Sequence, residues 1–203
     1  YGINGDGMIL VTNSLDLEQS ELPNLPKFGM SMALPKRFDN FTWFGRGPHE
    51  SYSDRKSSAK IDLYTGKVSD QYHPYIRPQE NGNKTDVRWA TFRDQYGYGL
   101  MLSGYLSLKA SHYTVDDYDT GVLIEDSGAL KLHKENRHTI DMVERNLVQL
   151  DIDHLQMGVG GEDSWGSQPM EEYQLKPRKY IYHFSMQLIE PSDEPGNIYK
   201  NSF

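Results

Sequence analysis

Three glycines in four residues, followed closely by a tryptophan, mark the segment with the clearest chemical potential. Residues 157–166 read Met-Gly-Val-Gly-Gly-Glu-Asp-Ser-Trp-Gly. Because glycine permits positive φ angles and close approach of neighbouring groups, we expect an irregular loop here. An indole on such a loop offers a flat apolar face and one N–H donor, which suits the C–H face of a sugar ring. Trp165 is therefore a candidate sugar platform, and the alternative is that it fills the end of a hydrophobic core.

The acidic residues of the same segment are poorly placed for acid–base chemistry. Glu162 and Asp163 are adjacent, and adjacent side chains of an extended segment point to opposite faces. Glycoside hydrolysis needs two carboxyl groups roughly 5–10 Å apart across a sugar. A phosphate-binding loop would continue with Lys and Ser or Thr, which this segment lacks. We expect both acids to be solvated turn residues.

A second segment, residues 43–55, combines aromatic rings, a Gly-Pro turn and several titratable groups. His49 and Glu50 could exchange a proton during catalysis. Alternatively, ion pairs could hold a long connection together, and we favour this interpretation because buried loops must satisfy their polar groups internally. The side chains available for such pairs are Arg46, Glu50, Asp54 and Arg55.

The third segment, residues 72–89, contains two prolines that argue against a central strand in its first half. Asn81-Gly82 predicts a turn, and a strand is expected from about Thr85. Several polar side chains of this segment could bind sugar hydroxyls or could form a buried polar network, and the sequence leaves both open. They are His73, Arg77, Gln79, Glu80 and Asn81.

The sequence gives little support for a transition-metal site or for a Ser-His-Asp triad. The seven histidines show no zinc-binding spacing, and no cysteine is present to complete such a site. We therefore predict no transition-metal site. A Ser-His-Asp triad has no Gly-x-Ser-x-Gly motif to support it. The histidines stand at positions 49, 73, 112, 133, 138, 154 and 183.

Composition narrows the class of protein and partner. A chain of 203 residues suits a single β-sandwich, and 12% aromatic residues favour strands. The net charge of −8 makes nucleic acid and anionic membranes poor partners, because both require a basic patch. A neutral sugar is compatible. The absence of cysteine excludes disulfides without fixing the compartment. The opening residues 1–7 resemble a strand end and turn, so we expect a fragment of a longer chain.

Alternation with a period of two predicts the strands, because side chains two apart share a face. Residues 180–189 are apolar on both faces in places, which suggests an inner strand. Thr114 and Asp117 have the spacing of a capping box, so a short helix should follow Thr114. Residues 191–203 lack alternation and are expected to be a tail or linker after a domain of residues 1–190. The alternating sets are Phe28, Met30, Met32 and Leu34; Leu100, Leu102, Leu106 and Leu108; Val148, Leu150 and Ile152; and Tyr180, Tyr182, Phe184, Met186 and Leu188.

Three stretches, taken in order, resemble the C-terminal domain of family 2 β-galactosidases. They are residues 43–55, residues 70–75 together with 78–82, and residues 157–165. The Gly-Gly-Glu-Asp-Ser-Trp of residues 160–165 is the most specific of them, and the resemblance extends over roughly residues 7–187. It implies an all-β, antiparallel supersandwich of the galactose-mutarotase type, with one or two short helices. It also implies that the opening strands of the sandwich lie upstream of Tyr1.

The same resemblance implies a non-catalytic domain of an enzyme that hydrolyses terminal β-D-galactosides such as lactose. Trp165 would stack on the non-galactose part of the substrate, as an aromatic platform on the leaving-group side. The family's catalytic Glu pair and metal ligands lie in a separate barrel domain, so no catalytic residue and no cofactor is assigned to this chain. Alone it is expected to be inactive. The whole enzyme commonly uses Mg and Na ions and is expected to be a homo-oligomer, with the barrel as this domain's main partner.

Two departures and two rival functions remain. Residues 119–132 form a longer stretch than the family usually has, and Arg77 stands where an apolar residue is common. A freestanding aldose 1-epimerase would need a histidine and a carboxylate converging on a sheet face, which the chain neighbours His49 and Glu50 fit poorly. The other rival is a non-catalytic carbohydrate-binding or scaffolding module. An anomer-interconversion assay tests the first rival, and sugar titration tests the second.

Overall fold

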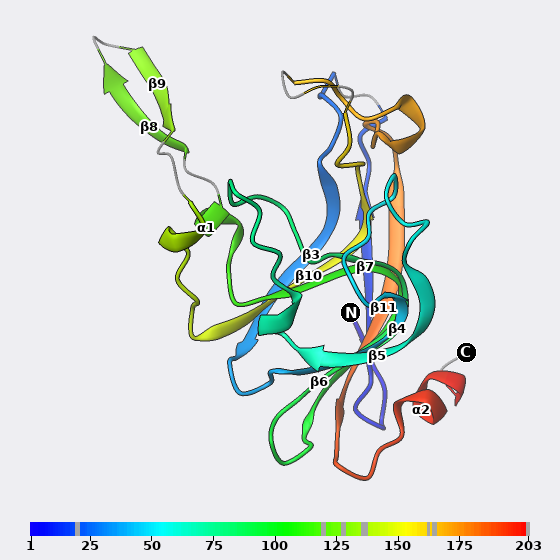
Figure 1. The fold of residues 1–203 in the computed structure, drawn as a ribbon. Coiled ribbons are helices and arrows are strands. Elements are labelled where there is room, and N and C mark those ends of the chain that lie inside the picture. Colours follow the sequence, from blue (N-terminus) through cyan, green and yellow to red (C-terminus); the bar gives the residue numbers. More distant parts are fainter. Residues whose placement is uncertain are drawn as a thin grey trace.

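The fold is a curved body of long strands, seen here in a computed structural model. It describes residues 1–18, 21–118, 121–126, 129–134, 138–161, 163 and 166–201, with the backbone alone for 121–126 and 129–134. A two-stranded hairpin of β8 (Gly121–Asp126) and β9 (Ala129–Lys134) projects from the body, and helix α2 (Pro195–Asn201) lies at the opposite end (Figure 1). Within the described part of the chain, no helix is long and apolar enough to span a membrane.

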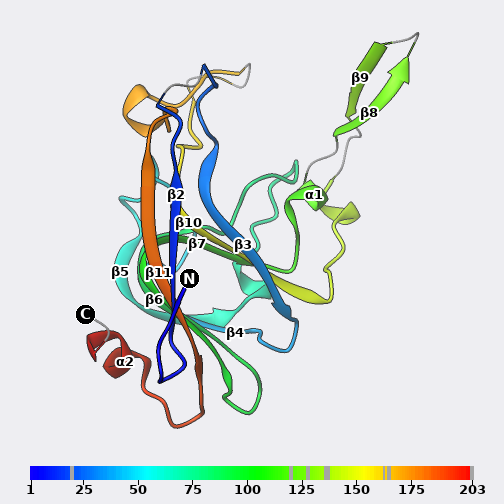
Figure 2. The ribbon, with the colours of Figure 1, turned by 180° about the vertical axis from the view of Figure 1, so that it is seen from behind.

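Antiparallel pairing joins nine strands of the body into one branched sheet. The branch point is β7 (Gly99–Ser111), which pairs with β11 through residues 99–104 and with β10 through residues 107–111. Figure 2 shows the second branch, β10 and β3, from behind. The predicted all-β, antiparallel sandwich is confirmed. The main path runs β1 (Gly2–Ile3), β2 (Ile9–Leu15), β11 (Tyr180–Ile189), β7, β6 (Lys84–Arg93), β4 (Asn40–Gly47) and β5 (Lys60–Lys67), and the branch adds β10 (Leu147–Gln156) and β3 (Lys27–Pro35).

The alternating residues fill one hydrophobic core between the branches, as their period predicts. On β10 the set 148, 150 and 152 is fully buried, and on β3 the set 28, 30, 32 and 34 packs against the same core. Aromatic rings from β4 and β6 add to it, with Phe41 stacked between Trp43 at 4.6 Å and Phe92 at 4.9 Å. The core holds the two sheet branches together because each contributes a continuous apolar face.

Strand β11 is an inner strand, as its two apolar faces predicted, since it pairs with both β2 and β7. Its last residues differ from the prediction. Leu188 was expected to share the buried face of Tyr180, yet it is 81% exposed, whereas Ile189 on the opposite face is 2% exposed. The reason lies outside the strand: Ile189 packs in a second small cluster with Trp89 and Met101.

Helix α2 lies within residues 191–203, which were expected to be a tail or linker. Its Ile198 and Tyr199 pack against the cluster of Trp89, Met101 and Ile189. The segment is therefore docked on the sheet in its helical part. Its sequence shows no period of two because the contact is made by one turn of helix, for which alternation is no guide.

The short helix predicted after Thr114 is present as α1 (Val115–Tyr118). The backbone N–H and the hydroxyl of Thr114 both donate to Asp117 Oδ2, at 2.7 and 3.1 Å. Asp117 thus satisfies a backbone N–H at the helix start that would otherwise lack a partner. Elsewhere in the described residues, helix is limited to α2 and to 3-10 turns at Ser69–Gln71, Thr139–Asp141 and Glu171–Tyr173.

Candidate functional site

Glu50 joins two of the three segments singled out in the sequence. Its Oε1 accepts hydrogen bonds from the Arg55 guanidinium and the Tyr75 hydroxyl, and its Oε2 accepts the backbone N–H of Gly82 at 2.7 Å. Gly82 has a φ of +77°, the conformation expected for the turn at Asn81-Gly82. The loop of residues 48–59 and the loop of residues 72–83 are therefore fastened through one carboxylate, which is 11% exposed.

Buried amides complete this junction. The N–H of His73 donates to Asn81 Oδ1 at 3.1 Å, and Asn83 Nδ2 donates to the Ser51 carbonyl at 2.9 Å. Ser51 N–H donates in return to the Asn83 carbonyl at 2.8 Å. Asn81 and Asn83 are almost fully buried. The sequence left two interpretations open for this segment, sugar binding and a buried polar network. Asn81 belongs to a buried polar network.

The third segment is held by Asp54. Its Oδ2 accepts the backbone N–H of Gly160 at 2.7 Å. A Cβ on Gly158 would lie 2.5 Å from Asp54 Oδ2, and one on Gly160 would lie 3.0 Å from it. A side chain at Gly158 would therefore collide with the carboxylate, whereas one at Gly160 would be in tight contact with it. All three sequence segments thus meet around the turn that carries residues 50–55.

A pocket of about 510 Å³ opens between Asp54 and the segment that follows the glycines. Gly161 and Ser167 approach each other closely, since a Cβ on Gly161 would lie 2.7 Å from the Ser167 carbonyl oxygen. Trp165, with its neighbours Glu162 and Ser164, lies outside the described residues. The pocket is lined by Asp54, Gly160, Gly161, Ser167, Gln168, Pro169, Met170 and Tyr173.

The charged side chains of residues 43–55 adopt the structural role favoured above. Glu50 and Arg55 form an ion pair, whereas Arg46 pairs with Asp86 of β6, a partner that the sequence did not indicate. His49 Nε2 lies 2.9 Å from Ser58 Oγ. Because His49 and the carboxylate of Glu50 have different partners, they do not form the proton-transfer pair considered above.

The remaining candidates of residues 72–89 have different contacts. Glu80 pairs with Lys109 at 3.2 Å, and the Lys109 side chain is 5% exposed. The His73 ring packs edge-on against Tyr75 at 4.3 Å. Arg77 is exposed. Glu80 is therefore engaged by a lysine, whereas His73, Arg77 and Gln79 are exposed on the same loop, and sugar binding by these three stays a prediction.

A buried group of charges was missed by the sequence reasoning. Asp151 and Asp153 of β10 are 1% and 3% exposed, and Lys27 of β3 pairs with them at 2.8 and 3.7 Å. Burial raises the pKa of Asp153 to about 7, and the like charge of Asp151 adds to the rise against the opposing effect of Lys27. The signal was two acids alternating with Leu150 and Ile152, which places both on the face opposite the core.

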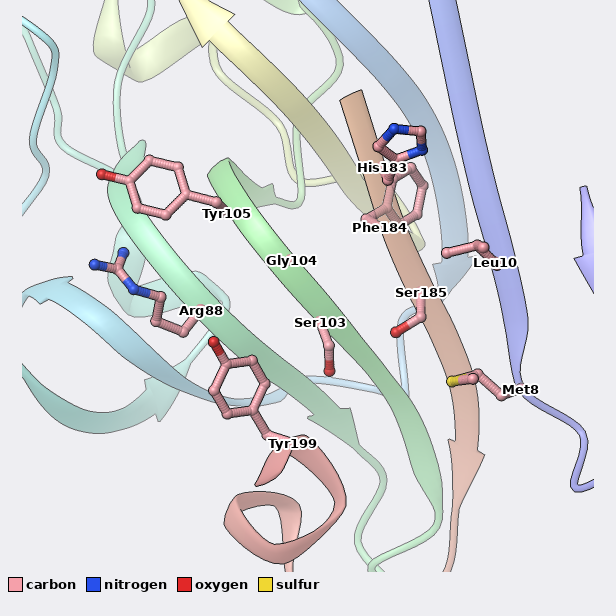
Figure 3. Close-up of a pocket in the computed structure, with 10 residues that line it drawn as sticks. All are labelled: Met8, Leu10, Arg88, Ser103, Gly104, Tyr105, His183, Phe184, Ser185 and Tyr199. Carbon is pink, nitrogen blue, oxygen red and sulfur yellow. The ribbon is translucent and has the colours of Figure 1, made fainter. Parts of the chain in front are cut away.

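A second pocket, of about 400 Å³, lies beside α2 on the sheet face away from the main core (Figure 3). The Arg88 guanidinium lies over the Tyr105 ring at 4.4 Å on one side, and His183 Nδ1 lies 2.9 Å from Thr12 Oγ1 on the other. Among the described residues that line it there is no carboxylate, although the hydroxyl of its Tyr105 donates to Asp86 Oδ1 at 2.7 Å. The lining residues are Met8, Leu10, Arg88, Ser103, Gly104, Tyr105, His183, Phe184, Ser185 and Tyr199.

His112 also has a structural role. His112 lies 3.2 Å from Asp39, but it is 2% exposed and its Nδ1 lies 2.6 Å from the Leu147 carbonyl oxygen, so it ties strands together. Among the described residues, no three histidine, aspartate or glutamate side chains are grouped to hold a metal ion.

Comparison with known proteins identifies the family. A family model described as the beta galactosidase small chain matches residues 1–188. A beta-galactosidase of Priestia megaterium is 35% identical over 192 residues, covering 92% of this chain and 17% of the relative. One of Vibrio cholerae is 33% identical over 194 residues, covering 96% and 17%. The beta-galactosidase BgaC of Bifidobacterium adolescentis is 35% identical over 167 residues, covering 80% and 15%.

The matched residues 1–188 include all three sequence segments, the glycine-rich loop among them. The chain spans about a sixth of the length of these relatives, at 15–17%. Together with the antiparallel sandwich and the three joined loops, the match settles the affiliation that the motifs suggested. This chain belongs to the family of the β-galactosidase small chain.

Proposed function

We propose that the chain is the C-terminal part of a β-galactosidase that hydrolyses terminal β-D-galactosides such as lactose. In this proposal the glycine-rich loop presents Trp165 to the leaving-group side of the substrate. The observation that carries it is the tether between Asp54 and the Gly160 amide, beside a pocket of about 510 Å³. A loop tied back at its glycines supports an aromatic platform, because a stacking face must be held in place to act.

The catalytic carboxylates belong, on this proposal, to another part of the enzyme. Hydrolysis needs two carboxyl groups flanking the glycosidic bond. Asp151 and Asp153 are both buried beside Lys27, and Glu50 is occupied by Arg55, Tyr75 and Gly82. The catalytic barrel, the substrate and further copies of the enzyme are the proposed partners. Nucleic acid and membranes are not, given the net charge of −8.

Replacing Trp165 in the full-length enzyme tests the platform. We expect Trp165→Ala to weaken lactose use and galactosyl transfer to glucose by roughly 5–30-fold, or about 1–2 kcal/mol, because one stacking face is lost. Hydrolysis of an aryl galactoside reports whether the galactose site persists. The melting temperature should change little, because a loop-borne platform contributes little to a core.

Trp43→Ala is the matched control, because Trp43 is 2% exposed and stacked on Phe41. It should lower stability by about 3–5 kcal/mol, as buried aromatic truncations do, without changing the preference between the two substrates. If Trp165→Ala behaves like Trp43→Ala, with a large loss of stability and unchanged lactose preference, Trp165 is a core residue and the platform role is rejected.

A further inference from the structure

The carboxylate of Asp54 lies against two glycines of the loop, Gly158 and Gly160. A Cβ on Gly158 would lie 2.5 Å from Asp54 Oδ2 and 2.7 Å from Cγ. At Gly160 the same oxygen accepts the backbone N–H at 2.7 Å. A hydrogen bond from a backbone N–H to a carboxylate is among the stronger ones in proteins. The glycine-rich segment is therefore shaped around one particular side chain, which is 106 residues away in sequence from Gly160.

Asp54 is itself held in a tight turn. Tyr52 and Arg55 exchange two backbone hydrogen bonds of 3.1 and 2.9 Å, which leaves Asp54 near the tip of the turn. The Arg55 guanidinium binds Glu50 and lies 5.2 Å from the centre of the Tyr52 ring, and Tyr52 is 1% exposed. Because both ends of the turn are anchored, the Asp54 carboxylate is a fixed point and not a mobile surface charge.

The hydrogen bond from Gly160 to Asp54, which we call the tether, leaves the second carboxylate oxygen in an unfavourable position. Asp54 Oδ1 is buried and accepts no hydrogen bond within the described part of the chain. A buried polar atom without a partner is unfavourable. The carboxylate therefore contributes one strong hydrogen bond, to Gly160, while its other oxygen has no partner in the described residues. The pocket between Asp54, Gly161, Ser167 and Tyr173 depends on where this tether holds the loop.

We propose that Asp54 is a positioning residue for the leaving-group side of the substrate site. It fixes the backbone at Gly158 and Gly160, and thereby the wall of the pocket that Gly160 and Gly161 line. This inference rests on the function proposed above, because it assigns a role within the same site. It predicts that the choice between substrates with different leaving groups is sensitive to a residue far from the reacting bond.

The experiment compares Asp54→Ala and Asp54→Asn in the full-length enzyme, with Glu171→Ala as the matched control. Glu171 is a carboxylate of the same loop region whose partner is Lys176, and its side chain is 78% exposed. Amide hydrogen exchange at Gly160 measures the tether directly. The ratio of kcat/KM for lactose and for an aryl galactoside measures positioning. Trp165→Ala and the double variant Asp54→Ala/Trp165→Ala show whether both residues act on the same step.

We expect Asp54→Ala to raise exchange at Gly160 by roughly tenfold or more, because the amide loses its acceptor. The lactose ratio should fall by about 5–30-fold, the range expected for loss of one stacking face. Asp54→Asn keeps an acceptor oxygen and should restore most of the protection and of the ratio. Glu171→Ala should match the wild type in both. The double variant should be no worse than Trp165→Ala alone, because a misplaced platform and an absent one are equivalent.

Each contrary result has one meaning. Unchanged exchange at Gly160 in Asp54→Ala overturns the tether. Faster exchange with an unchanged lactose ratio, while Trp165→Ala lowers that ratio, overturns positioning but leaves the proposed function standing. If Trp165→Ala also leaves the ratio unchanged, the proposed function itself fails. Should Asp54→Ala not fold, Gly158→Ala displaces the same carboxylate from the other side, and it must lower the lactose ratio for the proposal to survive.

Discussion

The carboxylate of Asp153 lies directly against Gly29 of the neighbouring strand. A Cβ on Gly29 would lie 1.9 Å from Asp153 Oδ1 and 2.5 Å from its Cα. The register between β3 and β10 shifts just after this pair, between Asp153 and Leu155. A strand interior normally disfavours glycine. Here the glycine makes room for a buried acid that Lys27 approaches at 3.7 Å.

Gly29→Ala should therefore be destabilising. The new methyl group cannot be accommodated by side-chain movement alone, because the backbone Cα of Asp153 also lies in its way. Overpacking of this kind costs about 1–3 kcal/mol. Gly5→Ala is the control, since nothing lies within 4 Å of its Cβ position. Thermal unfolding of the two variants beside the wild type checks the prediction, and equal melting temperatures would contradict it.

Asp153 should make stability depend on pH between about 4 and 7. Its pKa is about 7 in the folded chain, against an ordinary value of 3.8. In that window the unfolded chain loses the proton while the folded chain keeps it, so the free energy of unfolding falls as pH rises. The slope from this one group is about 1.4 kcal/mol per pH unit, and it levels off above pH 7.

Asp153→Asn removes this titration while keeping the shape of the side chain. The difference in unfolding free energy between wild type and variant should change steadily from pH 4 to 7 and then stay constant. Denaturant unfolding at several pH values measures it. A difference that does not vary with pH would show that Asp153 is ionised in the folded chain throughout this range.

Glu50 should be the most important carboxylate for joining the loops. Glu50→Ala leaves Arg55, Tyr75 and the Gly82 N–H without their acceptor. Leaving the buried Gly82 N–H without an acceptor costs about 1–3 kcal/mol, and the pair with Arg55, whose side chain is 50% exposed, adds at most about 1 kcal/mol. Glu50→Gln keeps an acceptor for Gly82 and should cost less. An exposed pair such as Glu171 with Lys176 contributes at most about 1 kcal/mol, so a loss no larger than that of Glu171→Ala in thermal unfolding would refute this ranking.

The isolated chain should hydrolyse no galactoside, because the reaction needs two flanking carboxyl groups and we assign none to this chain. The measurement is turnover of a chromogenic galactoside by purified chain, with the same preparation from cells that lack host β-galactosidase as the control. Turnover that co-purifies with the chain, and that is lost when one of its carboxylates is replaced, would show that this chain contains a catalytic pair.

The sequence by itself located the strands β3, β6, β7, β10 and β11 and the turn at Asn81-Gly82. Alternation at Val148, Leu150 and Ile152 identified the buried face of β10, and the spacing of Thr114 and Asp117 located α1. These features depend on neighbours a few residues apart, whose geometry follows from the backbone period. The order of the three motifs identified the family, since their agreement does not require knowledge of the fold.

Only the tertiary structure decided the partners of the charged groups. Asp54 binds the Gly160 amide, Arg46 pairs with Asp86, and Ile189 is buried under α2 while Leu188 is exposed. No local pattern specifies these contacts, because they join segments from separate parts of the chain. A carboxylate can accept hydrogen bonds from any donor within reach, and which donor comes within reach is set by how the strands and loops pack together.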